Sequence, residues 1–152
     1  MKTFFKVLGI LVVSVAVLAG GLFAWATFKT QKVTNAATPF IEKNLPLVTT
    51  WDVSQFDHLF TDVGLESLKS EQGQKIIKYL ARIGEMKSFE TPVFVKSSSK
   101  FSTKTGKQDV AIFTVNAVFE NGSGIITLSL VHQNSQYLFH GVHLDSNYYL
   151  DL

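Results

Sequence analysis

The sequence predicts an α+β domain that follows an N-terminal transmembrane helix. Three observations predict this class: an uncharged apolar run over residues 7–28, helical spacing of apolar residues up to residue 83, and alternating apolar residues from residue 86 onward. The chain has 152 residues, 46% of them hydrophobic and 17% charged, which fits one small domain with an apolar appendage. It has no cysteine, which excludes disulfides, thiol chemistry and cysteine-built metal sites.

The apolar run over residues 7–28 is long enough to cross a bilayer. Its 22 uncharged residues would extend about 33 Å as a helix, against a hydrocarbon core of about 30 Å. A cleaved signal peptide is the alternative, because small residues suited to a peptidase precede cuts after Ala19 or Ala26. The length favours a retained signal anchor in a bacterial inner membrane, with residues 1–6 cytoplasmic and residues 38–152 in the periplasm. Lysines flank both ends, so charge alone does not set the orientation.

Charge is unevenly distributed along the chain. Residues 1–32 carry four lysines and no acid, whereas residues 33–152 carry a net charge of −2. A nucleic-acid-binding domain would carry the basic excess itself, so nucleic acid is not an expected partner. Within the span, Ala16, Gly20 and Ala24 form a stripe suited to helix–helix packing, although small residues are common in membrane helices.

Capping residues divide the segment after the span into a linker and several helices. Residues 29–37 are polar and predict a linker, after which Thr38 and Pro39 begin a helix that Pro46 should end or bend. Further cap residues predict a helix over 55–60, another after residue 61 and a third over 71–83; these caps are Ser54, Thr61 and Ser70. Gly84 stands where a left-handed C-cap belongs.

Four antiparallel strands are expected after Gly84, over residues 86–98, 109–120, 125–133 and 136–146. Pro92 requires the first strand to be an edge strand or to contain a bulge. In the last strand the alternation slips, and a bulge at His140 and Gly141 would bring four apolar side chains to one face. These side chains are Tyr137, Phe139, Val142 and Leu144.

This order of elements comes with three short motifs: Trp51-Asp52 before the helices, Gly84-x-x-Lys87 where the sheet opens, and Ser146 at the end of the last strand. Together they resemble the cystatin-like or nuclear-transport-factor-two-like superfold, and in particular its small membrane-anchored bacterial members. The resemblance implies a curved sheet around helices, frequent dimerisation through the sheet, and membership that includes both enzymes and non-catalytic accessory domains. It therefore carries little information about function.

Two kinds of chemical site are weighed. Asp52, Tyr79 and His132 are the candidates for a pocket between helix and sheet, where a carboxylate beside a histidine or tyrosine would suit proton transfer. The alternative is structural, because Asp52 can cap a turn and a strand-end histidine usually bonds at the rim. His140 and His143 lie three apart and face opposite ways on a regular strand, so no metal site and no cofactor are expected.

Two surfaces are candidates for contact. Residues 96–107 form a lysine-rich loop without an acid, which could touch anionic headgroups or simply be solvated; its lysines are Lys96, Lys100, Lys104 and Lys107. The outward face of the sheet carries β-branched residues that would suit a partner or a dimer: Val110, Ile112, Val118, Ile125 and Val131.

The sequence therefore favours a single-pass, membrane-anchored periplasmic binding or assembly module, non-catalytic, that contacts a protein partner or dimerises through its sheet. The alternative is a small-ligand-binding or weakly enzymatic domain with a pocket between helix and sheet. A ligand pocket of about 300 Å³ or more would favour the alternative.

Overall fold

The computed structural model describes residue 17 and residues 30–102 and 106–150. The predicted span over residues 7–28, with its stripe of Ala16, Gly20 and Ala24, therefore lies outside the described residues except for Val17. The chain forms two compact units, Met1–Asn35 and Ala36–Leu152, and the second contains the sheet. Within the described part of the chain, no helix has the length and apolar character needed to cross a membrane.

A helix over residues 30–48 precedes the sheet, which corrects two predictions. The predicted linker is helical from residue 30 onward, and the helix continues through both Pro39 and Pro46. In the second unit this helix buries a continuous stripe, and that burial outweighs the one backbone hydrogen bond that each proline removes. The stripe consists of Ala37, Ile41, Leu45 and Val48, none more than 2% exposed.

Short helices follow, and side-chain caps begin three of them. They are α2 (Val53–Phe56), the 3-10 turn η1 (Asp57–Leu59), α3 (Asp62–Lys69), α4 (Glu71–Leu80) and η2 (Ala81–Ile83). The predicted caps Thr61 and Ser70 are confirmed for α3 and α4. Helix α2 is capped by Asp52 and not by Ser54, because the Asp52 carboxylate accepts a hydrogen bond from the backbone N–H of Ser54. Gly84 ends η2 with a positive φ of 85°, which glycine permits, but its ψ of −168° differs from the predicted left-handed cap.

The sheet has five antiparallel strands instead of four. They are β1 (Met86–Phe89), β2 (Val93–Ser102), β3 (Gly106–Phe119), β4 (Gly122–Gln133) and β5 (Gln136–Asp145). The order is β1-β3-β4-β5, and β2 also pairs with β3. The predicted first strand is split in two because Pro92, which cannot donate to a ladder, lies in the break between β1 and β2.

The lysine-rich segment over residues 96–107 is mostly strand, which corrects the prediction of a loop. Strand β2 runs to Ser102 and pairs with β3 up to the Ser102–Gly106 pair. Antiparallel pairing with β3 satisfies the backbone polar groups of residues 96–102, and the serines among them tolerate the extended conformation. Lys104 lies outside the described residues.

The bulge predicted in the last strand is confirmed at His140. Gly141 pairs with Ser129 and Phe139 pairs with Leu130, so His140 is the extra residue of β5. Because of this bulge, four side chains of β5 face the same side of the sheet. Their partners are every second residue of β4, which also share one face. The pairs are Tyr137–His132, Phe139–Leu130, Val142–Leu128 and Leu144–Ile126.

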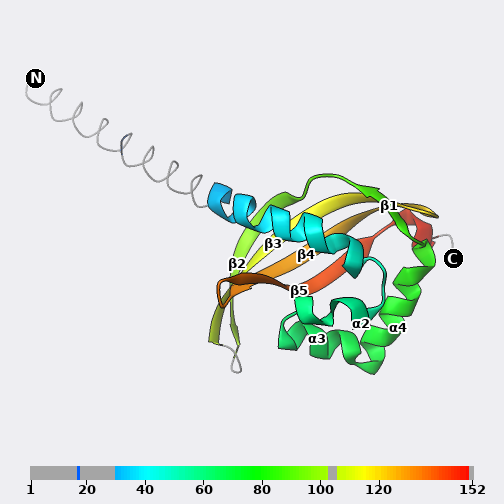
Figure 1. Cartoon of the computed structure of the whole chain (residues 1–152), viewed down its shortest axis with the longest axis horizontal. Helices are drawn as coiled ribbons and strands as arrows, with labels where there is room; N and C mark the ends of the chain where they lie inside the picture. Colours follow the sequence, from blue (N-terminus) through cyan, green and yellow to red (C-terminus); the bar gives the residue numbers. More distant parts are fainter. Residues whose placement is uncertain (1–16, 18–29, 103–105, 151–152) are drawn as a thin grey trace, which may run out of the picture. The chain divides into compact units, whose positions relative to one another are not determined.

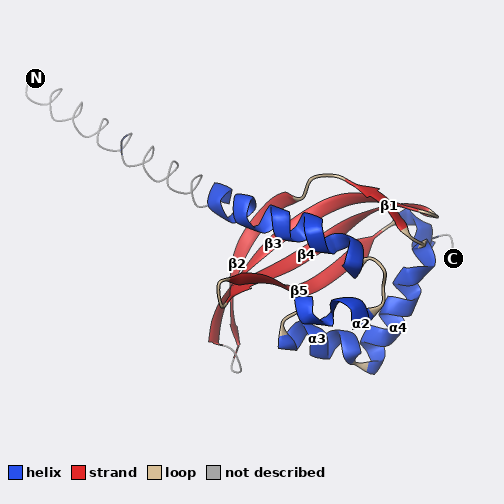
Figure 2. Ribbon diagram, in the orientation of Figure 1, coloured by secondary structure: helices blue, strands red, loops and turns tan. Residues whose placement is uncertain are grey.

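Within the second unit, the core lies between residues 36–48 of the 30–48 helix and the face of the sheet that they cover, here called the inner face (Figures 1 and 2). Phe40 packs its ring 5.0 Å from the ring of Phe139, centroid to centroid. Inner-face residues of the central strands have no exposed surface: Phe113, Ile126, Leu128 and Leu130. The structure thus confirms an α+β fold in which helices pack on a curled antiparallel sheet.

Helix α3 docks on the edge of this sheet, next to the bulge. The backbone N–H of Thr61 donates to the carbonyl of Phe139 at 2.9 Å, and its Oγ1 lies 3.0 Å from His140 Nδ1. A Cβ on Gly64 would come within 2.8 Å of the His140 carbonyl oxygen, so only glycine allows this approach. The bulge therefore fixes both the strand register and the position of α3.

Candidate functional site

An open groove of about 760 Å³ crosses the face of the sheet opposite the inner face. This outer face carries Ile112, Thr114, Asn116 and Val118 of β3 and their partners on β4, from Ser123 to Ser129. The groove lies at the end where β3 meets β1, and Val118 and Ile125 line it with 46% and 47% of their surfaces exposed. Two of the five predicted surface residues therefore line an exposed, partly apolar groove.

The C-terminal segment forms one wall of this groove. The 3-10 turn η3 (Asn147–Leu150) places Leu150 in the lining, with 82% of its surface exposed. Two tyrosines tie the segment to α4: the hydroxyl of Tyr149 donates to the Leu80 carbonyl at 2.6 Å, and the Tyr79 hydroxyl donates to the Tyr149 carbonyl at 3.2 Å. Burial raises the pKa of Tyr149 to about 12, with smaller contributions from Tyr79 and Tyr148.

A second hollow, of about 430 Å³, lies where the 30–48 helix ends and the sheet begins. Its lining combines the indole of Trp51, the apolar side chains of Pro46, Ala81 and Met86, and the two acidic residues Glu85 and Glu120. Its volume falls in the range of small-ligand sites, which begins near 300 Å³. A smaller cavity of about 140 Å³ lies between α3, α4 and β5 and is lined mostly by apolar residues.

Trp51 is strained and incompletely bonded. Its φ is 60°, in the left-handed region that a bulky residue rarely adopts. Its Nε1 is buried and has no hydrogen-bond partner among the described residues. Each of these features costs on the order of 1–3 kcal/mol, and such costs cluster at functional positions.

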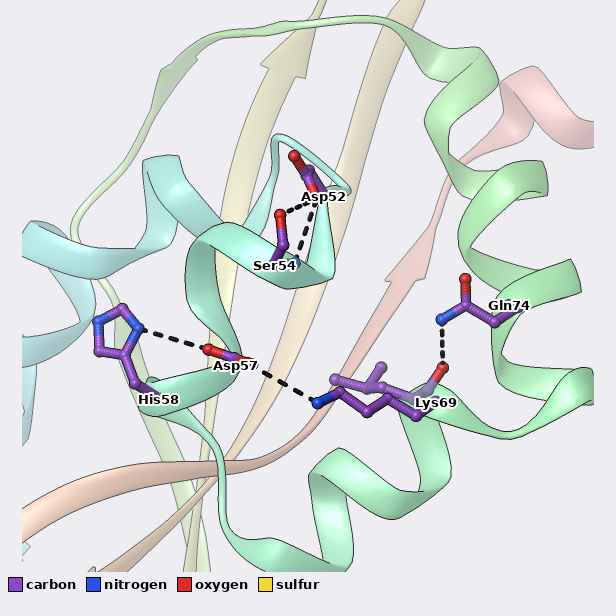
Figure 3. A network of polar contacts seen from close by, with 7 residues as sticks. Asp52, Ser54, Asp57, His58, Lys69 and Gln74 are labelled. Carbon is purple, nitrogen blue, oxygen red and sulfur yellow. Dashed lines mark hydrogen bonds and ion pairs between the residues drawn. The ribbon is translucent and has the colours of Figure 1, made fainter.

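The three predicted pocket residues do not come together. Asp52 is exposed at the start of α2, where its carboxylate accepts hydrogen bonds from Ser54 (Figure 3). It also accepts one from Gln55 Nε2 at 3.0 Å. These bonds, led by those from Ser54, lower the pKa of Asp52. Tyr79 is 40% exposed on α4, and His132 is exposed on β4 with its ring 4.8 Å from that of Tyr137. None of the three lines any of the three hollows given above.

The remaining predicted surface residues differ in exposure. Ile112 is half-buried, whereas Val110 and Val131 are only 1% and 2% exposed. These two valines are direct cross-strand partners in the two central strands. They cannot touch a partner in this structure, and the outward patch is reduced to Ile112, Val118 and Ile125.

The predicted lysine cluster is spread over both faces of the β2–β3 hairpin. Lys96 is exposed opposite Ile112 on the outer face, while exposed Lys107 pairs with Phe101 in the register of the inner face. Lys100 pairs with Gln108. Lipid contact by these residues stays a prediction.

Histidines and acids form small pairs rather than clusters. Residues 57, 58 and 69 form one exposed chain of contacts, with Asp57 lying 3.8 Å from His58 and 3.7 Å from Lys69 (Figure 3). His143 Nε2 lies 3.1 Å from Asp145 Oδ1 on the outer face. Within the described part of the chain, no group of three or more such side chains is placed to hold a metal ion.

Sequence reasoning missed both walls of the second hollow and the C-terminal wall of the groove. Trp51 and Gly84 belong to two separate motifs, and no local signal in the sequence indicates that they line one hollow. The apolar end of the chain was the signal for Leu150. Comparison of the chain with known protein families, with curated proteins and with solved structures finds no match.

Proposed function

We propose that this protein is a membrane-anchored, non-catalytic binding module that pairs with a second copy of itself through the outer face of its sheet. The groove on that face carries the proposal. Val118, Ile125 and Leu150 expose about half or more of their surfaces there, and adjacent apolar side chains of this kind on a monomer are typical of interaction sites.

The charges on the outer face favour a second copy as the occupant. Glu90 and Asp145 line the groove, and the Asn116 amide donates to Glu90 at 2.8 Å. Lys96 pairs with Ile112 of β3. Ile112 is four residues from Asn116 along the strand, which places Lys96 about 13 Å from the Asn116 end of the groove. A two-fold axis that passes between Lys96 and the two acids would pair two copies of the outer face. Lys96 of each copy would then lie against Glu90 and Asp145 of the other copy.

The membrane anchor rests on the sequence alone. Residues 7–28 are uncharged and long enough to span, and a tether would raise the local concentration of the domain in two dimensions. We place the domain in the periplasm of a bacterium and assign its fold to the cystatin-like superfold, for which the order of helices before a curled antiparallel sheet is the support. Membrane fractionation followed by an N-terminal mass determination tests the anchor; a soluble mature chain that lacks residues 1–26 would refute it.

Charge exchange tests the dimer. The mass of the full chain in mild detergent should be that of a dimer at high protein concentration, and both Lys96→Glu and Glu90→Lys should shift it toward a monomer. The double variant should restore the dimer, because the exchanged charges meet across the axis. Lys75→Glu on α4, where Lys75 pairs with Glu71, is the matched control and should leave the mass unchanged.

Two results would contradict this arrangement. A monomeric full chain at high concentration would exclude a second copy as the occupant of the groove. A dimer that survives every sheet variant and is lost in Gly20→Leu would assign the contact to the membrane span instead.

A further inference from the structure

The hollow beside Trp51 is independent of the outer face and has its own chemistry. The Trp51-Asp52 and Gly84-x-x-Lys87 motifs are 33 positions apart in the sequence, yet Trp51 and Gly84 line the same hollow of about 430 Å³. Hydrogen bonds fix the wall opposite Trp51. The backbone N–H of Glu120 donates to the Glu85 carbonyl at 2.9 Å, and that of Asn121 donates to the Ile83 carbonyl at 3.0 Å.

The missing side chain of Gly84 makes room for a carboxylate. A Cβ at this position would lie 2.7 Å from Oε2 of Glu120, so the carboxylate occupies the space that any other residue would fill. Within the described part of the chain, no hydrogen bond or ion pair involves this carboxylate. Glu85 is partly neutralised, because Lys87 Nζ lies 3.4 Å from its Oε2.

The remaining lining is apolar, aromatic or neutral. Trp51 contributes an indole, which attracts a cation over its face, while Thr49 already donates its hydroxyl to the Leu45 carbonyl. No lysine or arginine lines the hollow. An anion would therefore meet the unpaired carboxylate of Glu120 and the partly neutralised carboxylate of Glu85, whereas a cation with an apolar body would meet the Glu120 carboxylate, Trp51 and Met86.

We propose that this hollow binds a small organic ammonium ion, with the ammonium on Glu120 and its apolar chain against Trp51. Trp51 lines this hollow with its backbone in the left-handed region, at a φ of 60°. The ammonium group could belong to a free amine or to the lysine side chain of a peptide, and the two sources share this chemistry.

Three probes of matched size separate charge from apolar burial: n-pentylamine, 1-pentanol and pentanoate. The full chain carrying Trp25→Phe, in mild detergent, keeps Trp51 as its single tryptophan. Pentylammonium should change the fluorescence emission of Trp51 saturably. The affinity for 1-pentanol should be at least about tenfold lower, because the alcohol cannot make a charge-assisted hydrogen bond to the carboxylate. Pentanoate should have no effect. A lysine with both its backbone ends blocked, used as a fourth probe, distinguishes a peptide source from a free amine.

Glu120→Gln should weaken pentylammonium binding by about tenfold or more, because it removes the charge and keeps the shape. Glu71→Gln, an exposed carboxylate on α4, is the matched control and should bind as the parent does. Equal affinity for pentylammonium and 1-pentanol, no saturable change with any probe, or unchanged binding in Glu120→Gln would overturn the proposal. The dimer mass of the same variants, measured in parallel, keeps this outcome separate from that of the outer face.

Discussion

The two faces of the sheet are built from the same strands and yet have opposite surroundings. Along β3, Phe113, Val115 and Ala117 face the 30–48 helix and are at most 3% exposed, whereas Val118 on the other face is 46% exposed. The inner face is filled by the protein itself, so its residues can only hold the fold together. Within the described part of the chain, the outer face leaves Val118 and Ile125 about half exposed, so these side chains are accessible to another molecule.

The difference also separates the two kinds of damage that a substitution can do. Removing an inner side chain leaves a cavity and lowers the free energy of unfolding, with no direct effect on recognition. Changing an outer side chain near the groove alters what the face can bind and leaves the core intact. The comparison can be tested by substitutions of decreasing expected effect.

The largest expected effect is that of Phe139→Ala on the inner face. Phe139 is fully buried between Phe40 and Phe60, with ring centroids 5.0 and 5.5 Å away, so truncation should lower the free energy of unfolding by about 3–5 kcal/mol. Ile125→Ala, on the outer face, should cost less than about 1 kcal/mol. Urea unfolding at a concentration where the chain is monomeric measures both. Similar losses at the two positions would show that the faces are equivalent.

An intermediate effect is expected at the junction between α3 and the bulge of β5. Thr61→Ala removes both the N-cap bond to Gly64 and the contact with His140, and should cost about 1–2 kcal/mol. Ser70→Ala removes an exposed cap that bonds Gly73, and should cost about 0.5–1 kcal/mol. Thr61→Ser keeps the hydroxyl and should recover most of the loss in urea unfolding. If Thr61→Ala lowers the free energy of unfolding no more than Ser70→Ala does, the contact between α3 and the bulge does not fix the register of β5.

The smallest expected effect concerns the C-terminal wall of the outer groove. The pKa of Tyr149 is about 12 in the folded chain, raised from the ordinary tyrosine value of 10.0, so the folded state keeps the Tyr149 proton to a higher pH than the unfolded state does. This contribution to stability is complete below pH 10 and is lost as the pH rises from 10 to about 12. In Tyr149→Phe, the urea midpoint of unfolding should therefore fall less steeply between pH 10 and about 12 than in the parent. If the midpoints of parent and variant fall equally with pH, the Tyr149 hydroxyl does not anchor the C-terminal segment to α4.

Much of the fold follows from local patterns in the sequence. The caps at Thr61 and Ser70, the glycine at residue 84 and the alternation in β3 and β4 are local features, each fixed by a few neighbouring residues. The bulge at His140 was also predictable, because a change in the parity of apolar residues leaves few alternatives when one face is buried. The expected pocket of Asp52, Tyr79 and His132 was different, since it depended on the distance between separate elements.

The sequence by itself determined the order of helices before strands, the caps at Thr61 and Ser70 and the inward face of β3 and β4, because these depend on spacing and on backbone chemistry within a few residues. Tertiary structure alone decided that the 30–48 helix continues through two prolines, since burial of its apolar stripe outweighs the lost bonds. It also decided that Val110 and Val131 are covered while Val118 and Ile125 are not. Trp51 and Glu120 share one hollow for the same reason, because contacts between distant residues depend on packing and not on local spacing.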